Sequence, residues 1–146
     1  MNLIDQVRAA NDYSAALQSI ISHFQADSGT IHMLESDGVL HLKAASQGLP
    51  EAVLAVVRLV PVGKGMAGLA VKRGEPVDTC NLQTDASGNV KPGARATGME
   101  GAIVVPIFAG DKAVGALGIA NRATRTFSAE ETALLMEAGR AIAVTL

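Results

Sequence analysis

The sequence predicts an α+β fold in which helices at both ends of the chain cover one face of a mainly antiparallel sheet. Two pairs of apolar segments, each joined by a short polar turn, have the pattern of β-hairpins. Amphipathic helical spacing dominates residues 2–25 and 128–146. Because strands and helices come in blocks and do not alternate strictly, the pattern favours an α+β arrangement over an α/β one.

The N-terminal segment, 2–25, repeats apolar residues at spacings of three and four, which indicates one helix or two. Asn11-Asp12 interrupts this repeat and offers an N-cap for a second helix. Asp27-Ser28-Gly29 is expected to end the helical region.

The first predicted hairpin joins strands at 30–34 and 39–45 through Ser36-Asp37-Gly38, because Asp-Gly tolerates the positive φ of a tight turn. Side chains along a strand point alternately to its two faces. One face of the second strand is therefore predicted to carry Leu40, Leu42 and Ala44, and the other His41 and Lys43.

The middle of the chain predicts shorter elements. A short helix begins at Leu49-Pro50-Glu51, where the proline suits a first helical turn. Residues 59–62 are extended, and a helix over 66–72 ends at Gly74. A brief strand is expected at Pro76-Val77-Asp78.

The C-terminal part predicts a second hairpin and a final helix. Strongly apolar strands at 102–108 and 113–120 are joined by Ala109-Gly110-Asp111-Lys112. Ser128 followed three residues later by Glu131 is a capping box, which marks the start of the last helix.

The spacing G-x-G-x-x-G at Gly63, Gly65 and Gly68 also occurs in dinucleotide-binding loops. That fold needs repeated β-α-β units around a parallel sheet, which the two hairpins oppose. A P-loop is excluded, because Lys64 is followed by Gly65 and not by Ser or Thr. We interpret the glycines as residues that permit a tight turn and close packing of a helix on the sheet.

Length and composition predict one globular domain over 1–146, with its core in 28–121. Apolar residues make up 49% of the chain and aromatic residues only 3%, so the core is aliphatic. A net charge of −2 without a clustered basic face argues against nucleic-acid binding. The sole cysteine, Cys80, excludes an internal disulfide. Since neither a signal peptide nor a membrane-spanning run is evident, we expect a cytoplasmic location without membrane insertion.

Four stretches resemble the GAF domain, a small sensory module of signalling proteins, and together they cover nearly the whole chain. The resemblance implies a GAF-like fold, akin to PAS and profilin-like folds. In it, terminal helices lie on one face of about six antiparallel strands, and a small-molecule pocket lies under loops on the other. The stretches are Ala26-Asp27-Ser28-Gly29-Thr30-Ile31, the glycine loop 63–68 through Gly74-Glu75-Pro76-Val77, Ala102-Ile103-Val104-Val105-Pro106-Ile107, and Val114-Gly115-Ala116-Leu117-Gly118-Ile119-Ala120-Asn121 followed by Phe127-Ser128-Ala129-Glu130-Glu131.

The resemblance implies a non-catalytic sensory or regulatory function without an identified cofactor or metal. Such a domain binds a small ligand and relays the signal through a helical homodimer interface to an attached output domain. The helical pattern that reaches Leu146 without a C-cap agrees with such an attachment. A domain that only dimerises and binds no ligand is the alternative that the sequence leaves open.

The candidate ligand-binding residues are those expected near the mouth of the implied pocket. Residues 81–98 are polar and form a loop of the length typical of lids and binding loops. Arg95 within it suits an anionic ligand, because a guanidinium binds carboxylate or phosphate as a fork. The full set is Met66, Asp78, Thr79, Arg95, Met99, Glu100 and Val105.

Free methionine-(R)-sulfoxide reductases resemble isolated GAF domains of this size, but the residues argue against their chemistry. Thiol chemistry of that kind needs a nucleophilic and a resolving cysteine, and Cys80 is alone. The resemblance places that family's loop cysteine at Ala67, and its acidic substrate-binding residues at positions filled here by alanine or glycine. Those positions are Ala102, Gly118 and Ala120. We predict no enzyme, and a lone cysteine is usually a small buried apolar residue.

Cyclic-nucleotide binding is a further alternative. GAF domains of that type carry an Asn-Lys pair, a downstream Phe and an Asp-Glu pair, which Asn121-Arg122, Phe127 and Glu130-Glu131 match in part. A simpler interpretation is that Phe127 anchors the start of the last helix and Glu131 caps it.

A tetrapyrrole or metal centre is the remaining alternative. Covalent bilin attachment typically uses a cysteine followed by histidine, whereas Asn81 follows Cys80. His23, His32 and His41 are dispersed, although the last two lie on the first hairpin and would be able to face each other. Histidines on alternating strand positions more often lie at a half-buried surface than at a metal.

Overall fold

A computed structural model, which describes residues 2–84, 87 and 98–146, shows an α+β fold around one six-stranded sheet. The strand order is β3-β2-β1-β6-β5-β4, and every strand pair in the described residues is antiparallel. The predicted fold class is confirmed, and the parallel sheet of a dinucleotide-binding fold is not formed. The strands are β1 (Ser28–Leu34), β2 (Val39–Ala45), β3 (Leu59–Pro61), β4 (Val77–Thr79), β5 (Gly101–Ala109) and β6 (Lys112–Asn121).

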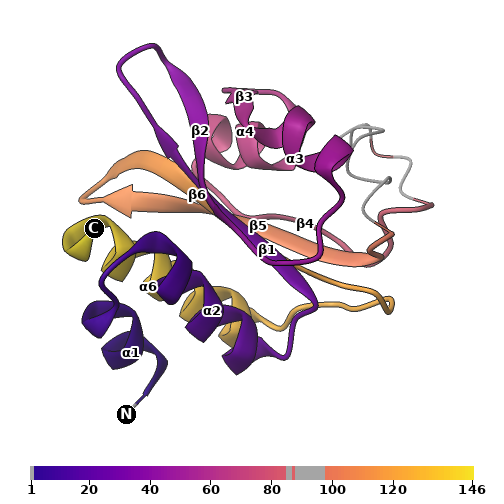
Figure 1. Ribbon diagram of the computed structural model, residues 1–146, viewed down its shortest axis with the longest axis horizontal. Coiled ribbons are helices and arrows are strands. Elements are labelled where there is room, and N and C mark those ends of the chain that lie inside the picture. The colour runs from indigo at the N-terminus through magenta and orange to yellow at the C-terminus, as the bar shows by residue number, and fades with distance from the viewer. Residues whose placement is uncertain (1, 85–86, 88–97) are drawn as a thin grey trace.

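The helices lie in two groups on opposite faces of the sheet (Figure 1). The helices from the two ends of the chain pack together on one face, and the two short helices from its middle lie on the other. The first group is α1 (Leu3–Ala9), α2 (Tyr13–Phe24) and α6 (Ala129–Thr145), and the second is α3 (Glu51–Val57) and α4 (Gly65–Arg73).

The helix ends follow the capping chemistry of the sequence. The side chain of Asp12 accepts a hydrogen bond from the backbone N–H of Ala15 at 2.8 Å, so the predicted second N-cap is confirmed. Ser128 and Glu131 form the predicted capping box, each accepting a hydrogen bond from the other's backbone N–H at 3.0 Å. The helical region ends at Phe24, as the predicted range 2–25 requires, because Gln25 adopts a left-handed conformation. β1 then begins at Ser28.

Alternation along the central strands separates two apolar clusters. Towards α1, α2 and α6 the sheet contributes Ile31, Ile103, Val105, Ile107, Leu117 and Ile119. Towards α4 a smaller cluster forms around Met66, Ala70, Val77, Leu82, Met99 and Ala102. The sheet therefore carries the larger apolar cluster on its helix face and the smaller one on the opposite face.

The predicted alternation of β2 is wrong in one respect. His32 pairs with Leu42 but the preceding Ile31 pairs with Ala44, so Lys43 is an extra residue that bulges out of the ladder. A bulge of this kind interrupts the two-residue period of a strand. As a result Ala44 joins the helix-side core with Ile31, and Leu40 and Leu42 do not share its face.

The glycine loop acts as the turn that places α4. Gly63 and Gly65 have φ of 91° and 63°, which side chains rarely permit. A Cβ on Gly68 would collide with the carbonyl oxygen of Pro61, so this glycine allows α4 to pack closely on the preceding strand. The backbone N–H of Gly63 donates to the carbonyl of Gly68 at 2.8 Å and closes the loop on the helix.

Candidate functional site

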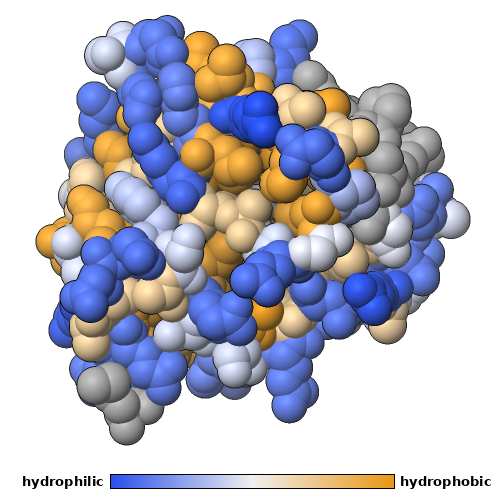
Figure 2. Space-filling view, viewed as in Figure 1, coloured by the Kyte–Doolittle hydropathy of each residue, from blue (hydrophilic) through white to orange (hydrophobic). Residues whose placement is uncertain are grey.

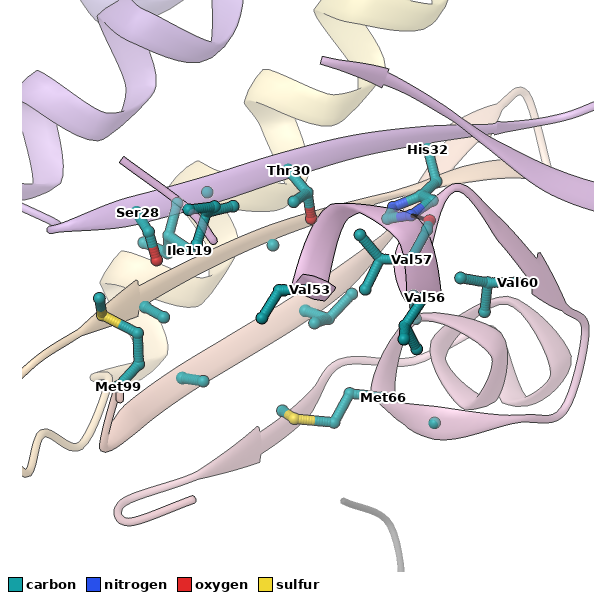
Figure 3. Close-up of a pocket in the computed structure, with 18 of the residues that line it drawn as sticks. Ser28, Thr30, His32, Val53, Val56, Val57, Val60, Met66, Met99 and Ile119 are labelled. Carbon is teal, nitrogen blue, oxygen red and sulfur yellow. Dashed lines mark hydrogen bonds between the residues drawn. The ribbon is translucent and has the colours of Figure 1, made fainter. Parts of the chain in front are cut away.

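A cavity of about 210 Å³ lies on the face of the sheet opposite the terminal helices. Its floor is formed by β1, β5 and β6, and its roof by α3, β3 and the first turn of α4 (Figure 3). Leu82 and Met99, which flank the segment beyond β4, complete the wall. A cavity of this kind is the usual form of a small-molecule site.

The floor is deep because its residues are small. Gly118 of β6 lies between Thr30 of β1 and Val104 of β5, and Ala120 pairs with Ala102. A Cβ added at Gly118 would lie 3.2 Å from Cγ2 of Val104 and 3.6 Å from Oγ1 of Thr30. Any larger side chain at this position would therefore occupy the cavity.

Three polar side chains follow one another along β1 on the cavity side. Ser28, Thr30 and His32 occupy alternate positions, so all three point to the same face. Figure 3 shows the hydroxyl oxygen of Thr30 directed from β1 towards α3, that of Ser28 on the side of the cavity where Met99 lies, and the imidazole of His32 beside Val57. We call these three residues the β1 polar row.

His32 is the most informative member of the β1 polar row. The residue is only 3% exposed, and its Nε2 lies 2.8 Å from the carbonyl oxygen of Val57. Since a carbonyl accepts and never donates, Nε2 carries the proton. Burial lowers the pKa of His32, which keeps the ring neutral near pH 7. Nδ1 is then an acceptor, and it is buried without a hydrogen-bond partner among the described residues.

The remaining lining is almost entirely apolar. Val53, Val57, Met66 and Met99 surround the space opposite the β1 polar row (Figure 3). Within the described lining, Lys64 is the one residue whose side chain is charged, and it is exposed. The arrangement provides no buried counter-charge for an ionic ligand in the part of the chain that is described.

Exposed apolar side chains lie at the rim of the cavity. Val56 of α3 and Leu59 of β3 line it and are 60% and 56% exposed. Figure 2 shows hydrophobic residues gathered on the surface in this region of α3 and β3. Exposed apolar patches of this kind occur at ligand-binding grooves and interaction sites.

The predicted apolar site residues divide between the two faces of the sheet. Met66 and Met99 line the cavity. Val105 lies in the helix-side core instead, because it follows Val104 in β5 and strand neighbours point to opposite faces.

The predicted polar site residues do not line the cavity where they are described. Asp78 is exposed on the edge strand β4, and the Thr79 hydroxyl accepts from the backbone N–H of Asn81 at 3.3 Å. Glu100 accepts hydrogen bonds from the Asn81 amide at 3.1 Å and the Thr124 hydroxyl at 2.9 Å, so it joins two segments of backbone. Arg95 and most of the expected lid fall outside the described residues.

The residues of the partial cyclic-nucleotide pattern make structural contacts away from the cavity. The Asn121 amide donates to the carbonyl of Gln25 at 2.9 Å, and the N–H of Arg122 donates to Asp27 at 2.7 Å. The guanidinium of Arg125 lies 4.6 Å from the ring centre of Phe127 and donates to Glu131 at 2.7 Å. These contacts fix the path of the chain into α6.

The cysteine and histidine expectations need two corrections. Cys80 is exposed and not buried, because it follows the short edge strand β4. His32 is buried and not half-buried, and it does not face His41, which pairs with Met33 and lies 2.8 Å from the Asp37 carboxylate. Among the described residues no group of three His, Cys, Asp or Glu side chains is arranged to hold a metal.

The β1 polar row was missed by the sequence prediction. Its signal is the two-residue alternation of Ser28, Thr30 and His32 with Gly29 and Ile31. The same alternation is typical of a strand with one face in water. Only the packing of α3 over this face turns a solvent-facing pattern into a cavity wall.

A comparison with protein families identifies one family for this chain. The GAF domain family matches residues 13–146. No curated protein sequence matches the chain. Within the described part of the chain, no helix is long and apolar enough to cross a lipid bilayer.

Solved structures share the fold at low sequence identity. The GAF domain of an Acinetobacter phosphoenolpyruvate-protein phosphotransferase aligns with a TM-score of 0.79 at 17% identity, covering 98% of this chain and 87% of that one. The type II free methionine-R-sulfoxide reductase of Thermoplasma acidophilum gives 0.73 at 21%, covering 99% and 94%. A domain of a putative two-component sensor histidine kinase from Sinorhizobium meliloti 1021 gives 0.70 at 18%, covering 89% and 84%.

These similarities establish the fold, and the family match covers nearly all of the chain. The sheet order, the terminal helices on one face and the cavity on the other agree with it. The chain therefore belongs to the GAF domain family.

Proposed function

We propose that this GAF domain is a non-catalytic sensory or regulatory module that binds a small ligand in the cavity between the sheet and α3. The observation that supports this most is the cavity itself, which combines apolar walls with the β1 polar row. Apolar lining supplies affinity, and a few placed polar groups supply orientation and specificity.

The proposed output runs through the terminal helices to a second copy of the chain and to an attached output domain. α1, α2 and α6 lie on the face away from the cavity, so a change in the sheet reaches them through the helix-side core (Figure 1). Two of the similar structures are domains of a phosphoenolpyruvate-protein phosphotransferase and of a putative two-component sensor histidine kinase, which supports a regulatory role. A ligand shifts such a module only by binding its two states with different affinity.

Two chemical features favour this proposal over a reductase. Cys80 is the single cysteine of the chain and is absent from the cavity lining, which holds Ala67 in the glycine loop. Ala102, Gly118 and Ala120 form the floor, so no carboxylate projects from these three positions. We expect no reduction of free methionine-R-sulfoxide above the rate without protein, and thiol-dependent turnover would contradict a non-catalytic role.

A thermal-shift screen on matched variants tests ligand binding. The screen covers nucleotides, amino acids, small acids and small aromatic compounds, since a ligand that binds only the native state raises the melting temperature. Gly118→Val fills the cavity, and Ala109→Val adds volume at an exposed end of β5 as the control. We expect hits that persist in Ala109→Val and vanish in Gly118→Val.

A screen without hits, or hits that Gly118→Val leaves unchanged, would favour the ligand-free dimerisation scaffold. Cyclic nucleotides are included in the screen to test the cyclic-nucleotide alternative. If cAMP or cGMP stabilised the domain and Gly118→Val removed the effect, the cyclic-nucleotide alternative would replace an unidentified ligand.

A further inference from the structure

We propose that the cavity takes a compact, uncharged and largely apolar molecule, about the size of a phenol or an indole, whose N–H or O–H donates a hydrogen bond to Nδ1 of His32. This inference rests on the proposed function and names the chemical class of its ligand. It follows from the volume of the cavity, the charges of its lining and the protonation of one ring.

The volume limits the ligand to one or two small rings. The cavity measures about 210 Å³. An apolar cavity of about 150 Å³ in another protein holds benzene. The space here therefore suits a substituted benzene or a fused bicyclic molecule, whereas a nucleotide with its sugar and phosphate would extend beyond the cavity into solvent.

The lining selects against formal charge. Val53, Val57, Met66 and Met99 have no group that compensates an ion, and the exposed Lys64 stands at the rim. Transfer of an unpaired ion into such surroundings is costly. The first turn of α4 also lines the cavity, and the partial positive charge of a helix N-terminus is the feature that would oppose this selection, so an anionic probe belongs in the test.

The direction of the hydrogen bond follows from His32. Nε2 already donates to the Val57 carbonyl, and Nδ1 is a buried acceptor without a described partner. A buried acceptor that stays unpaired destabilises the state that contains it. Nδ1 is closed to water in this structure, so a ligand donor reaches it only when the neighbouring side chains adjust around the ligand. Such a donor relieves this cost, while a ligand acceptor at the same point would face another lone pair.

Thr30 strengthens the same assignment. Its hydroxyl lies next to His32 in the β1 polar row, on the cavity side of the sheet (Figure 3). A hydroxyl both donates and accepts hydrogen bonds. The Thr30 hydroxyl can therefore donate to the oxygen of a phenol whose own O–H donates to the imidazole. The β1 polar row thus forms one polar edge for a ligand that is otherwise in apolar contact.

Matched probes isolate the donor. Phenol and anisole share a ring, but anisole has no O–H, and indole and N-methylindole form a second pair. Benzoate serves as the anionic probe. Titrations followed by ¹⁵N spectra of the histidine rings measure affinity and report whether Nδ1 of His32 gains a hydrogen bond, which a merely structural histidine would not do.

Two substitutions separate the roles of the imidazole nitrogens. His32→Gln keeps a donor at the position of Nε2 for the Val57 carbonyl and removes the acceptor. His32→Asn keeps an acceptor near the position of Nδ1 and removes the donor to Val57. We expect the affinity ratio of phenol to anisole to fall about fivefold in His32→Gln, the worth of one neutral hydrogen bond, and to be retained in His32→Asn.

Several outcomes would overturn the inference. These are equal phenol-to-anisole ratios in the wild type and His32→Gln, tighter binding of benzoate than of phenol, or no binding of any of the five probes. Each leaves the proposed function to be judged by the wider screen with Gly118→Val. If that screen also gives no hits that depend on Gly118, the proposal that the domain binds a ligand is itself contradicted.

Discussion

At the scale of single residues, glycines decide where this chain can come into close contact with itself. Gly68 lies against the carbonyl of Pro61, and Gly139 of α6 lies over Ile107 with ordinary spacing. Both are helical, yet a methyl group added to them meets different surroundings. Sequence spacing alone would treat the two glycines alike.

We predict opposite effects of the same substitution at these two glycines. Gly68→Ala forces the backbone of the glycine loop apart, and overpacking of this kind costs about 1–3 kcal/mol. Gly139→Ala places its Cβ 3.4 Å from Ile107 and gains helix propensity, so it stabilises by up to about 1 kcal/mol. Urea denaturation of both variants measures the change, and a stable Gly68→Ala would contradict the packing described for α4.

The buried His32 predicts a pH dependence of stability. Its folded pKa is lowered by burial, with the Val57 hydrogen bond opposing, while the unfolded chain protonates at the ordinary value near 6.5. The unfolded state therefore binds the proton first, and stability is lost as the pH falls below about 6.5.

The expected loss is at most about 1.4 kcal/mol per pH unit within that window. Denaturation midpoints of the wild type and His32→Gln between pH 7.5 and 5 should diverge, with the variant losing less. His23→Gln, at an exposed position of α2, is the control that should follow the wild type. Parallel profiles for the wild type and His32→Gln would show that the ring is not buried in its neutral form.

At the scale of elements, the predictable features were those with local chemistry. The Ser128 and Glu131 box, the Asp12 cap, the two hairpins and the terminal helices follow from side chains within a few residues of each other. The bulge at Lys43 was not predictable, because it depends on which residues of β1 pair with which residues of β2, and this register cannot be deduced from the sequence of β2 alone. The face of Ala44 changes with it.

The candidate site shows the same division. Met66 was predictable because it lies in the first turn of the helix that the glycine loop places over the sheet. Ser28, Thr30 and His32 were not, since polar alternation looks the same beside water and beside a cavity. Val105 shows that apolar residues near a predicted pocket need the strand register before they can be assigned to a face.

The cap of α6 gives a prediction for this scale. Ser128→Ala removes the acceptor for the Glu131 N–H and is expected to cost about 1 kcal/mol. Glu130→Gln, in the same turn but outside the capping box, should cost less, because it removes only the favourable interaction of a charge with the helix dipole. Thermal denaturation measures the loss of stability in both variants. An equal loss would mean that the capping hydrogen bond contributes no more to stability than the interaction of the Glu130 charge with the helix dipole.

At the scale of the whole molecule, the two faces of the sheet have separate tasks in the proposed mechanism. The helix face holds the larger core and carries both ends of the described chain, and the other face holds the cavity. This separation allows ligand chemistry to vary without changing the packing of the terminal helices.

The proposed dimer is testable at one position of the terminal helices. Val144, near the end of α6, is 77% exposed. Light scattering after size-exclusion chromatography should give twice the chain mass for the wild type, and a lower average mass for Val144→Glu. Arg140→Glu, on the same helix but bonded to the Gly110 carbonyl at 2.9 Å, tests whether charge alone explains the change. A monomer at high concentration would exclude relay through this interface.

The methionines provide the most direct test of ligand binding in the cavity. Met66 and Met99 line it, whereas Met33 and Met136 pack against the helix-side core. In a sample with ¹³C-labelled methionine methyl groups, addition of phenol or of a hit from the screen should shift the signals of Met66 and Met99 and leave those of Met33 and Met136 in place. Shifts confined to Met33 and Met136, or no shift at saturating ligand, would contradict a ligand site between the sheet and α3.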